Sequence, residues 1–231
     1  MKEFTLQWLG QGGYALRIDG TALYLDPYLS DMVERVDGPR RLVAPPIKPE
    51  DARPGYFLAT HEHMDHLDLD LISQMDCAGV VFICPESCVS KLLALAVAQE
   101  QIKIIKQGNV LNLGCCKLKA VFADHTPGSV GFVINAHGKA IYFTGDTLYH
   151  DAVGTEIDCD VTCCCINGRW GNMNAEEALR VALRSGAKLA IPNHYGMFAE
   201  NNADPAIFCA LAEQAGLKTY TMGHGEEIPL I

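Results

Sequence analysis

The sequence contains no apolar run of the roughly 18–20 residues that a membrane-spanning helix needs. Its first residues, 1–5, lack the apolar core of a secretory signal peptide and lead directly into a predicted strand. These two absences favour a cytoplasmic protein that acts without a membrane partner.

Basic residues are scarce: 18 Lys and Arg residues stand against 28 Asp and Glu residues, which gives a formal net charge of −10. An acidic surface repels phosphate backbones, so we expect no nucleic-acid partner. With 49% hydrophobic and 20% charged residues, the chain can bury a substantial core, and its composition excludes extensive disorder. Since no segment looks like a linker, we expect residues 1–231 to form a single domain.

The ten cysteines lack C-x-x-C spacing, so the usual zinc-ribbon and thioredoxin motifs are missing. We expect most of them to be small apolar core residues with reduced thiols. A thiolate metal cluster at 163–165 is the alternative. Neighbouring side chains on a strand point to opposite faces, however, so three consecutive thiols cannot converge on one ion.

Hydrophobic periodicity predicts strands first and then strands alternating with helices, a pattern that occurs twice. The predicted strands are 4–9, 14–18, 21–25, 55–60, 80–83, 102–106, 109–113, 116–123, 130–136, 139–144, 160–166, 187–192, 217–221 and 226–230. The predicted helices are 68–75, 85–99, 174–185 and 204–215, and 31–54 is expected to be a loop. A weak internal echo between 22–26 and 140–146 fits two similar halves that pack sheet against sheet, with helices outside.

The stretch Gly10-Gln11-Gly12-Gly13-Tyr14-Ala15 superficially matches a dinucleotide-binding fingerprint. That fingerprint needs a helix directly after it. Here a predicted strand follows, so we interpret the stretch as a tight turn and expect no nucleotide site.

The densest chemical signal lies at 60–68, where Thr-His-Glu-His-Met-Asp-His-Leu-Asp follows a predicted strand. A strand end followed by a tight loop would place His61 and His63 on the same side, with Asp65 and His66 turned back toward them. Imidazole and carboxylate groups supply the N and O donors that zinc and manganese accept. The alternative is a solvated acidic, His-rich loop.

Three further candidates, His125, Asp146 and His194, each follow the end of a predicted apolar strand. Gly145 lets the backbone turn so that the carboxylate of Asp146 can face inward. His224, between two glycines, competes with His194 as the last ligand, although its terminal turn is more typical of a structural residue. Together with the cluster at 61–66, these residues predict a metal site.

This ordered set resembles the metallo-β-lactamase superfamily: His-x-His-x-Asp-His, then a His, a Gly-Asp-Thr aspartate and a final His. The resemblance covers nearly the whole chain and implies an α/β, four-layer αββα sandwich with two divalent metal ions, zinc or manganese, between the sheets. It implies a first ion held by His61, His63 and His125, a second held by Asp65, His66 and His194, and a bridging Asp146. A histidine at position 63, where a flavodi-iron redox protein would carry a carboxylate, favours hydrolysis.

Within that superfamily the chain is similar to the L-ascorbate-6-phosphate lactonases at 8–10, 25–27, 60–68, 191–194 and 203–205. It lacks their longer N-terminal extension, and its loop at 167–173 differs. The resemblance therefore supports the same fold and metal ligands more strongly than it supports a lactone substrate.

The ligand set implies a hydrolytic mechanism. Two metals about 3.5–4 Å apart can lower the pKa of a shared water toward 7 and supply a hydroxide that attacks an ester, lactone or phosphoester. Asp65 and Asp146 are the predicted catalytic carboxylates, which orient the nucleophile and move its proton. Asp26 ends a neighbouring strand and either orients a ligand imidazole or serves as a turn residue before Pro27.

The expected substrate is a small anionic molecule such as a sugar phosphate. Arg169 is the predicted contact, because a guanidinium binds carboxylate or phosphate with two hydrogen bonds. Asn167 in the same loop and Tyr195 beside His194 are also predicted to bind substrate. Two other functions stay open: a phosphodiesterase or nuclease of the same fold, and a non-catalytic metal-binding protein. The ligands suit zinc, manganese and iron, so the sequence does not select the metal. It also leaves open whether the protein forms a homo-oligomer.

Overall fold

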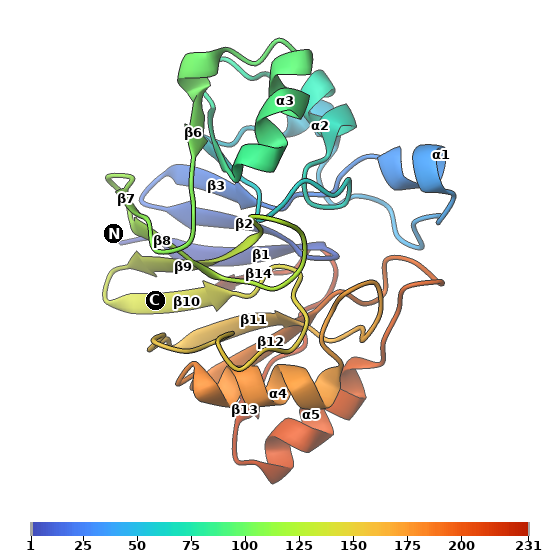
Figure 1. Cartoon of the computed structure of the whole chain (residues 1–231), viewed down its shortest axis with the longest axis vertical. Coiled ribbons are helices and arrows are strands. Elements are labelled where there is room, and N and C mark those ends of the chain that lie inside the picture. Colours follow the sequence, from blue (N-terminus) through green and yellow to red (C-terminus); the bar gives the residue numbers. More distant parts are fainter. Residues whose placement is uncertain (1, 231) are drawn as a thin grey trace.

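The computed structural model describes residues 2–230, whose strands form two seven-stranded sheets (Figure 1). The first sheet contains, in spatial order, β14 (Glu227–Pro229), β1 (Phe4–Gly10), β2 (Gly13–Ile18), β3 (Thr21–Leu25), β4 (Tyr56–Leu58), β5 (Val81–Cys84) and β6 (Ile102–Ile104). The second contains β13 (Lys218–Thr219), β12 (Leu189–Asn193), β11 (Val161–Cys165), β10 (Lys139–Phe143), β9 (Val130–Ala136), β8 (Lys117–Phe122) and β7 (Val110–Asn112).

Both sheets follow one pattern of strand directions. In the first sheet, β1, β2 and β3 are antiparallel, and β3 then pairs in parallel with β4, which β5 and β6 follow. In the second, β8, β9 and β10 are antiparallel, and β10 pairs in parallel with β11, which β12 and β13 follow. Because β3 and β10 occupy equivalent places, the two similar halves expected from the sequence echo are confirmed.

Helices cover the outer face of each sheet (Figure 1). Over the first sheet lie α2 (Leu69–Gln74) and α3 (Glu86–Ala94), and over the second lie α4 (Ala175–Arg184) and α5 (Pro205–Gln214). The connections contain the short helix α1 (Met32–Asp37) and the 3-10 turns η1 (Pro49–Asp51) and η2 (Gln99–Gln101). This is the four-layer αββα arrangement that we predicted. Within residues 2–230, no helix combines the length and the apolar character needed to cross a membrane.

Apolar side chains fill the spaces between the layers. The cluster between the sheets includes Leu16 and Leu23 from the first sheet and Phe132 and Ile141 from the second, and all four are fully buried. Two further clusters join each sheet to its helices. Removing this apolar surface from water is the main term that stabilises such a sandwich and makes its strand ends rigid supports for a site.

The predicted helix caps are present. Asp68 accepts the backbone N–H of Leu71 at the start of α2. At the start of α4, Asn174 accepts the N–H of Glu177, whose carboxylate accepts the N–H of Asn174 in return. These contacts satisfy N–H groups that have no partner inside the helix.

Two predicted segments differ from the structure by more than two residues. The helix predicted at 85–99 ends at Ala94, because Ala96 has a φ of 60° and a left-handed residue cannot continue a right-handed helix. The loop predicted at 31–54 contains α1 and η1, so part of it is helical.

The ten cysteines are all free, and seven of them are buried. The three consecutive cysteines of β11 are fully buried: Cys163 belongs to the cluster between the sheets, and Cys164 belongs to the cluster beneath the helices. No group of potential metal ligands within the described residues includes a cysteine. The prediction that most cysteines are small core residues is confirmed.

Candidate metal centre

Side chains from both sheets meet at one place, in connections that follow strand ends. Four come from the loop after β4 in the first sheet, and three come from the connections after β8, β10 and β12 in the second. In chain order they are His61, His63, Asp65, His66, His125, Asp146 and His194. The structure therefore brings together all seven residues that the sequence predicted as ligands.

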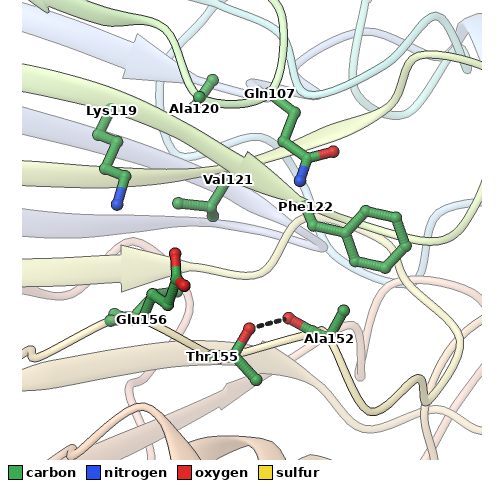
Figure 2. A pocket seen from close by; sticks show the side chains of 11 residues that line it. Gln107, Lys119, Ala120, Val121, Phe122, Ala152, Thr155 and Glu156 are labelled. Carbon is green, nitrogen blue, oxygen red and sulfur yellow. Dashed lines mark hydrogen bonds between the residues drawn. The ribbon is translucent and has the colours of Figure 1, made fainter.

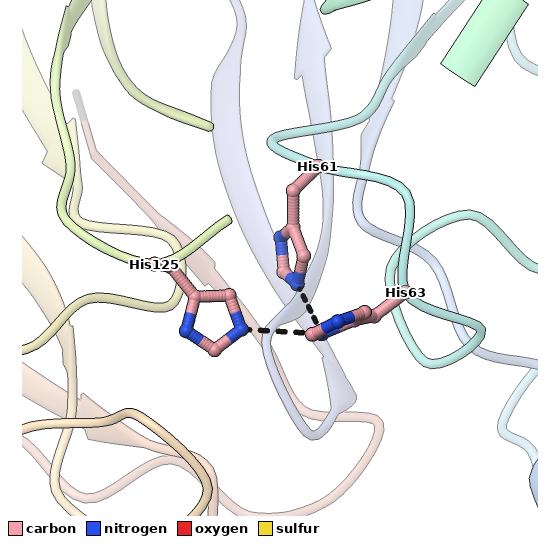
Figure 3. Close-up of side chains that lie close together, drawn as sticks. All are labelled: His61, His63 and His125. Carbon is pink, nitrogen blue, oxygen red and sulfur yellow. Dashed lines mark hydrogen bonds between the residues drawn. The ribbon is translucent and has the colours of Figure 1, made fainter. Parts of the chain in front are cut away.

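The first ligand group consists of His61, His63 and His125 (Figure 3). The Nε2 atom of His61 lies 3.1 Å from Nδ1 of His63, and Nε2 of His125 lies 3.1 Å from the same Nδ1 atom. His61 is fully buried, whereas His63 is exposed. Three imidazole nitrogens that converge in this way can bind one divalent cation.

The second ligand group consists of Asp65, His66 and His194. The Nε2 atom of His66 lies 3.3 Å from Nε2 of His194 and 3.7 Å from Oδ2 of Asp65. Asp146 lies between the two groups: its Oδ1 atom is 2.7 Å from Nε2 of His194, and its Oδ2 atom is 3.9 Å from Nε2 of His125. Each carboxylate oxygen of Asp146 thus faces a different group, as a bridging ligand requires.

The donors of this centre face one another in a way that bound cations would satisfy. Nδ1 of His66 contacts Asp26, and Nδ1 of His125 lies 3.1 Å from the carbonyl oxygen of Gly171, so both rings direct an Nε2 lone pair inward. Lone pairs that face each other and face carboxylate oxygens repel unless a proton or a metal lies between them. Within residues 2–230, Oδ1 of Asp146 is buried without a donor in hydrogen-bond geometry. The residues therefore fit divalent cations with N and O ligands.

Burial and charge shift the pKa values of the centre in different directions. Burial lowers the pKa of His61 well below its usual value, and the neighbouring His66 lowers it further. Burial opposes ionisation of His66, but Asp146 and Asp26 raise the pKa of this ring well above its usual value. Burial alone would raise the pKa of Asp146, yet His194 and His66 hold it well below its usual range. A charged carboxylate among imidazoles is the distribution that a cation prefers.

Asp26 orients one of these rings. Its Oδ2 atom lies 2.8 Å from Nδ1 of His66 and accepts the hydroxyl of Thr60 at 2.7 Å. Its Oδ1 atom accepts the backbone N–H of Thr60, also at 2.7 Å. A buried carboxylate held in this way fixes the ring that it contacts and makes the opposite nitrogen a better ligand. Of the two roles left open for Asp26, these contacts support the orienting role.

Gln11, which lies in the turn between β1 and β2, supports the centre without having been predicted from the sequence. Its side chain is fully buried, and its Nε2 atom donates to Oδ2 of Asp65 at 2.9 Å. Its backbone carbonyl accepts the N–H of His194 at 3.2 Å and Nε1–H of Trp8 at 3.1 Å. Gln11 therefore contacts two members of the second ligand group. Asp65 lies 54 residues further along the chain, so no local pattern marks this contact.

Two glycines allow the backbone to approach the ligand rings closely. A Cβ atom at Gly12 would lie 2.9 Å from Cε1 of His66, and one at Gly171 would lie 2.8 Å from Nδ1 of His125. Next to Gly171, Asn172 donates its Nδ2–H to Oδ2 of Asp146 at 2.9 Å. The turn at 10–13 and the loop at 167–174 thus support the ligands, a role that was not predicted for either segment.

Backbone strain concentrates at the same place. Gln11, Asp26, Trp170 and His194 have φ values of 52°, 45°, 53° and 64°, in the left-handed region that side chains other than glycine rarely adopt. Such residues persist where the surrounding structure over-determines them, commonly at functional sites.

A cavity of about 360 Å³ opens onto the ligands His63, Asp65, Asp146 and His194. A smaller cavity of about 130 Å³ lies between β8 and the segment 152–157 (Figure 2). Thr155 closes that segment through a hydrogen bond from its hydroxyl to the carbonyl oxygen of Ala152. None of the predicted site residues lines the smaller cavity, so the larger one is the candidate substrate site.

Tyr195 and His224 line a separate cavity of about 200 Å³. Tyr195 packs against Trp8 with a ring separation of 4.9 Å, and its hydroxyl donates to the carbonyl oxygen of Met222 at 3.3 Å. His224 belongs to none of the potential ligand groups within the described residues, whereas His194 does. The geometry thus selects His194 over His224 as the last ligand.

Asn167 and Arg169, the other predicted substrate contacts, are also absent from the lining of the 360 Å³ cavity. Asn167 is buried and donates Nδ2–H to Oδ1 of Asn201 at 2.6 Å, and Asn201 does line the cavity. Arg169 is exposed, with a guanidinium nitrogen 3.4 Å from the carbonyl oxygen of Glu200. Asn167 thus supports a lining residue, and direct substrate contact by these residues and by Tyr195 stays a prediction.

Sequence comparisons find relatives along most of the chain. The family described as "Beta-lactamase superfamily domain" matches residues 21–195. A UPF0173 metal-dependent hydrolase of Thermoplasma acidophilum is 31% identical over 228 residues, which cover 94% of each chain. A UPF0173 protein of Pyrococcus furiosus is 29% identical over 209 residues, which cover 87% of each chain.

Solved structures share the fold. Igni18, a metallo hydrolase from Ignicoccus hospitalis, matches with a TM-score of 0.80 and 22% identity, covering 99% of this chain and 98% of that one. The isothiocyanate hydrolase from Delia radicum gut bacteria matches with a TM-score of 0.78 and 17% identity, covering 97% and 98%. These likenesses confirm the fold that we predicted from the order of the ligands.

Proposed function

The chain belongs to the beta-lactamase superfamily, within the UPF0173 metal-dependent hydrolases, and from this premise we propose that it hydrolyses an ester or lactone bond in a small molecule. The observation that carries the proposal is the meeting of two ligand groups around Asp146 beside a cavity of about 360 Å³. One divalent cation, zinc or manganese, would be held by His61, His63 and His125, and the other by Asp65, His66 and His194, with Asp146 shared.

Cations bound there would polarise the acyl oxygen of the substrate and lower the pKa of a water molecule. Asp65 and Asp146 would manage the proton. The side chain of Asp146 is 6% exposed and is held by Asn172, so it suits orientation of the water. The side chain of Asp65 is 18% exposed and lines the cavity, so it can accept the proton and pass it on.

The proposed reaction consumes one water molecule. A bond forms between the water oxygen and the acyl carbon, and the bond between the acyl carbon and the leaving oxygen breaks. The proton that the water loses reaches the leaving alkoxide through Asp65. The products are a carboxylic acid and an alcohol, which remain in one molecule when the substrate is a lactone.

The charges around the cavity favour an ester or lactone over a phosphoester. Lys91 is the single basic side chain of the lining other than the histidine ligands, and it is accompanied by Asp37 and Glu62. Apart from the two cations, a phosphoester or a nucleic acid would meet little positive charge in the lining, and the chain as a whole carries a net charge of −10. From the resemblance to L-ascorbate-6-phosphate lactonases we therefore retain the lactone or ester bond, and we do not retain the anionic substrate.

The test is a panel of sugar lactones, simple esters and phosphodiesters, offered to protein loaded with zinc or with manganese. We expect turnover of the ester or lactone members. His61→Ala should lower that activity by more than about a hundredfold, the upper range for residues that only orient a ligand. The control is His150→Ala, which removes an exposed imidazole outside the ligand groups. Normal activity in His61→Ala, or no turnover of either substrate class at full metal occupancy, would contradict the proposal.

A further inference from the structure

Apolar side chains form much of the wall of the 360 Å³ cavity. Val33, Met64 and Phe198 line it together with Trp170. Val33 and Phe198 are buried members of one apolar cluster, against which Met64 packs. This part of the wall is therefore continuous with the packed interior, and we expect it to keep its shape when a ligand binds.

Two polar side chains of the lining, Glu62 and Lys91, are already hydrogen-bonded within the protein. Glu62 accepts hydrogen bonds from the hydroxyls of Ser87 at 2.8 Å and Thr126 at 3.1 Å. Nζ of Lys91 donates to the backbone carbonyl oxygen of Glu62 at 2.7 Å. Apart from the metals, Lys91 is therefore the single cation that an anionic substrate group would meet in this lining, and the carboxylates of Asp37 and Glu62 oppose it.

Trp170 has an unusual combination of exposure and strain. It is 57% exposed, which leaves a large apolar ring in water, and its φ of 53° is unfavourable for a tryptophan. Two contacts to the ligands fix the loop that carries it, from the carbonyl oxygen of Gly171 to His125 and from Asn172 to Asp146. An exposed ring held beside a metal centre is typical of a surface that a ligand covers.

We propose that the substrate carries an uncharged apolar group, aliphatic or aromatic, that binds against Val33, Met64, Phe198 and Trp170 while its ester or lactone bond reaches the ligands. This inference rests on the proposed function for the reacting bond, but the apolar wall carries it independently of the reaction. The volume limits the size of the substrate: a cavity of about 150 Å³ accommodates benzene, so about 360 Å³ accommodates the reacting bond and the apolar group together at roughly twice the size of benzene.

The test is a series of γ-lactones whose alkyl tail grows from none to six carbons, together with an analogue whose tail ends in a carboxylate. We expect kcat/KM to rise about threefold to fourfold for each methylene group that enters the cavity. The carboxylate analogue should be slower than its uncharged counterpart by about tenfold or more, because its charge loses hydration against an apolar wall. Equal rates along the series, or preference for the carboxylate, would overturn the inference and leave the hydrolase proposal standing.

Substitution of Trp170 localises the effect. Trp170→Ala should flatten the dependence on tail length, mainly through KM, whereas Trp170→Phe should preserve most of it. The matched control is Ile207→Ala, which removes an apolar side chain of similar exposure, 58%, from α5. A series that keeps its full slope in Trp170→Ala would show that the ring does not contact the tail.

A binding assay separates this inference from the proposed reaction. The chain has two tryptophans, and Trp8 is buried while Trp170 is exposed, so quenching or a blue shift that Trp170→Phe abolishes reports on this cavity. The probe is a hexyl γ-lactam, which keeps the shape of the lactone and resists hydrolysis. A fluorescence change without lactone turnover would contradict the proposed function and support the apolar site. Turnover without any fluorescence change would contradict the apolar site alone.

Discussion

Replacing Gln11 by methionine tests how much one buried amide that contacts a ligand contributes to metal affinity, while all seven ligands stay in place. Methionine has a similar length and is apolar, so it keeps the packing and removes the hydrogen bond from Nε2 to Oδ2 of Asp65, which measures 2.9 Å. The backbone carbonyl of residue 11 still accepts the N–H of His194. The substitution therefore loosens Asp65 and leaves the first ligand group untouched.

The size of the effect follows from two features of the contact. Partners that orient a metal ligand typically contribute about 10-fold to 100-fold in metal affinity, so we expect a loss of that size for the cation held by Asp65. The free energy of unfolding should change by less than about 1 kcal/mol, because methionine also removes the buried Oε1 atom of Gln11, which has no hydrogen-bond partner within the described residues. The substitution should thus weaken metal binding while leaving the free energy of unfolding nearly unchanged.

The assay is a calorimetric titration of metal-stripped protein with zinc, accompanied by urea unfolding of the same sample. The control is Gln214→Met, which makes the same change on the exposed surface of α5. One binding step should weaken in Gln11→Met and the other should keep its affinity. Unchanged affinity in both steps would refute the orienting role of Gln11, as would an equal loss in both.

Two further predictions concern Asp26 and the cysteines. Asp26→Ala removes the acceptor of three buried donors, two on Thr60 and one on His66. The hydroxyl of Thr60 keeps Nδ1 of His61, 3.0 Å away, as an alternative partner. Metal-stripped protein should therefore lose about 2 kcal/mol or more in urea unfolding, at about 1–3 kcal/mol for each of the two remaining donors, and a loss below about 1 kcal/mol would contradict these contacts. Burial raises the pKa of the Cys165 thiol to about 12, so reactivity with a thiol reagent should be almost absent at pH 8 and should rise with pH as the thiolate forms. Peptide mapping of native protein at pH 8 should find label first on the three half-buried cysteines, which are Cys77, Cys115 and Cys209. Early label on the buried thiols of β11 would show that this strand opens.

The ligands could be predicted because each of them carries a local signal. His125, Asp146 and His194 each follow an apolar strand, and strands are recognisable from their own residues. The order of the ligands along the chain then implied the fold. Asp26 was marked by the echo between 22–26 and 140–146, which reflects the equivalent places of β3 and β10 in the two sheets.

The supporting residues could not be predicted in this way, because their contacts depend on tertiary structure. Gln11 and Asn172 reach Asp65 and Asp146 across 54 and 26 residues of chain, and nothing in the local sequence indicates those partners. Tyr195 illustrates the opposite error. It is adjacent to His194 in sequence, but it lines a different cavity, because the chain bends at His194, whose φ is 64°, and the Tyr195 ring packs against Trp8.

The origin of the ligands has a consequence for how the molecule unfolds. Each ligand group takes two members from the loop after β4 and one from the opposite sheet. A cation in either group is therefore a non-covalent cross-link between the two halves of the chain, in a protein whose ten cysteines form no disulfide. A ligand that binds only the folded state stabilises it by about 2.7 kcal/mol at a free concentration one hundred times its Kd. Cation supply should thus add to the packing that holds the two halves together, and a chelator should lower the free energy of unfolding by the amount that the bound cations contribute.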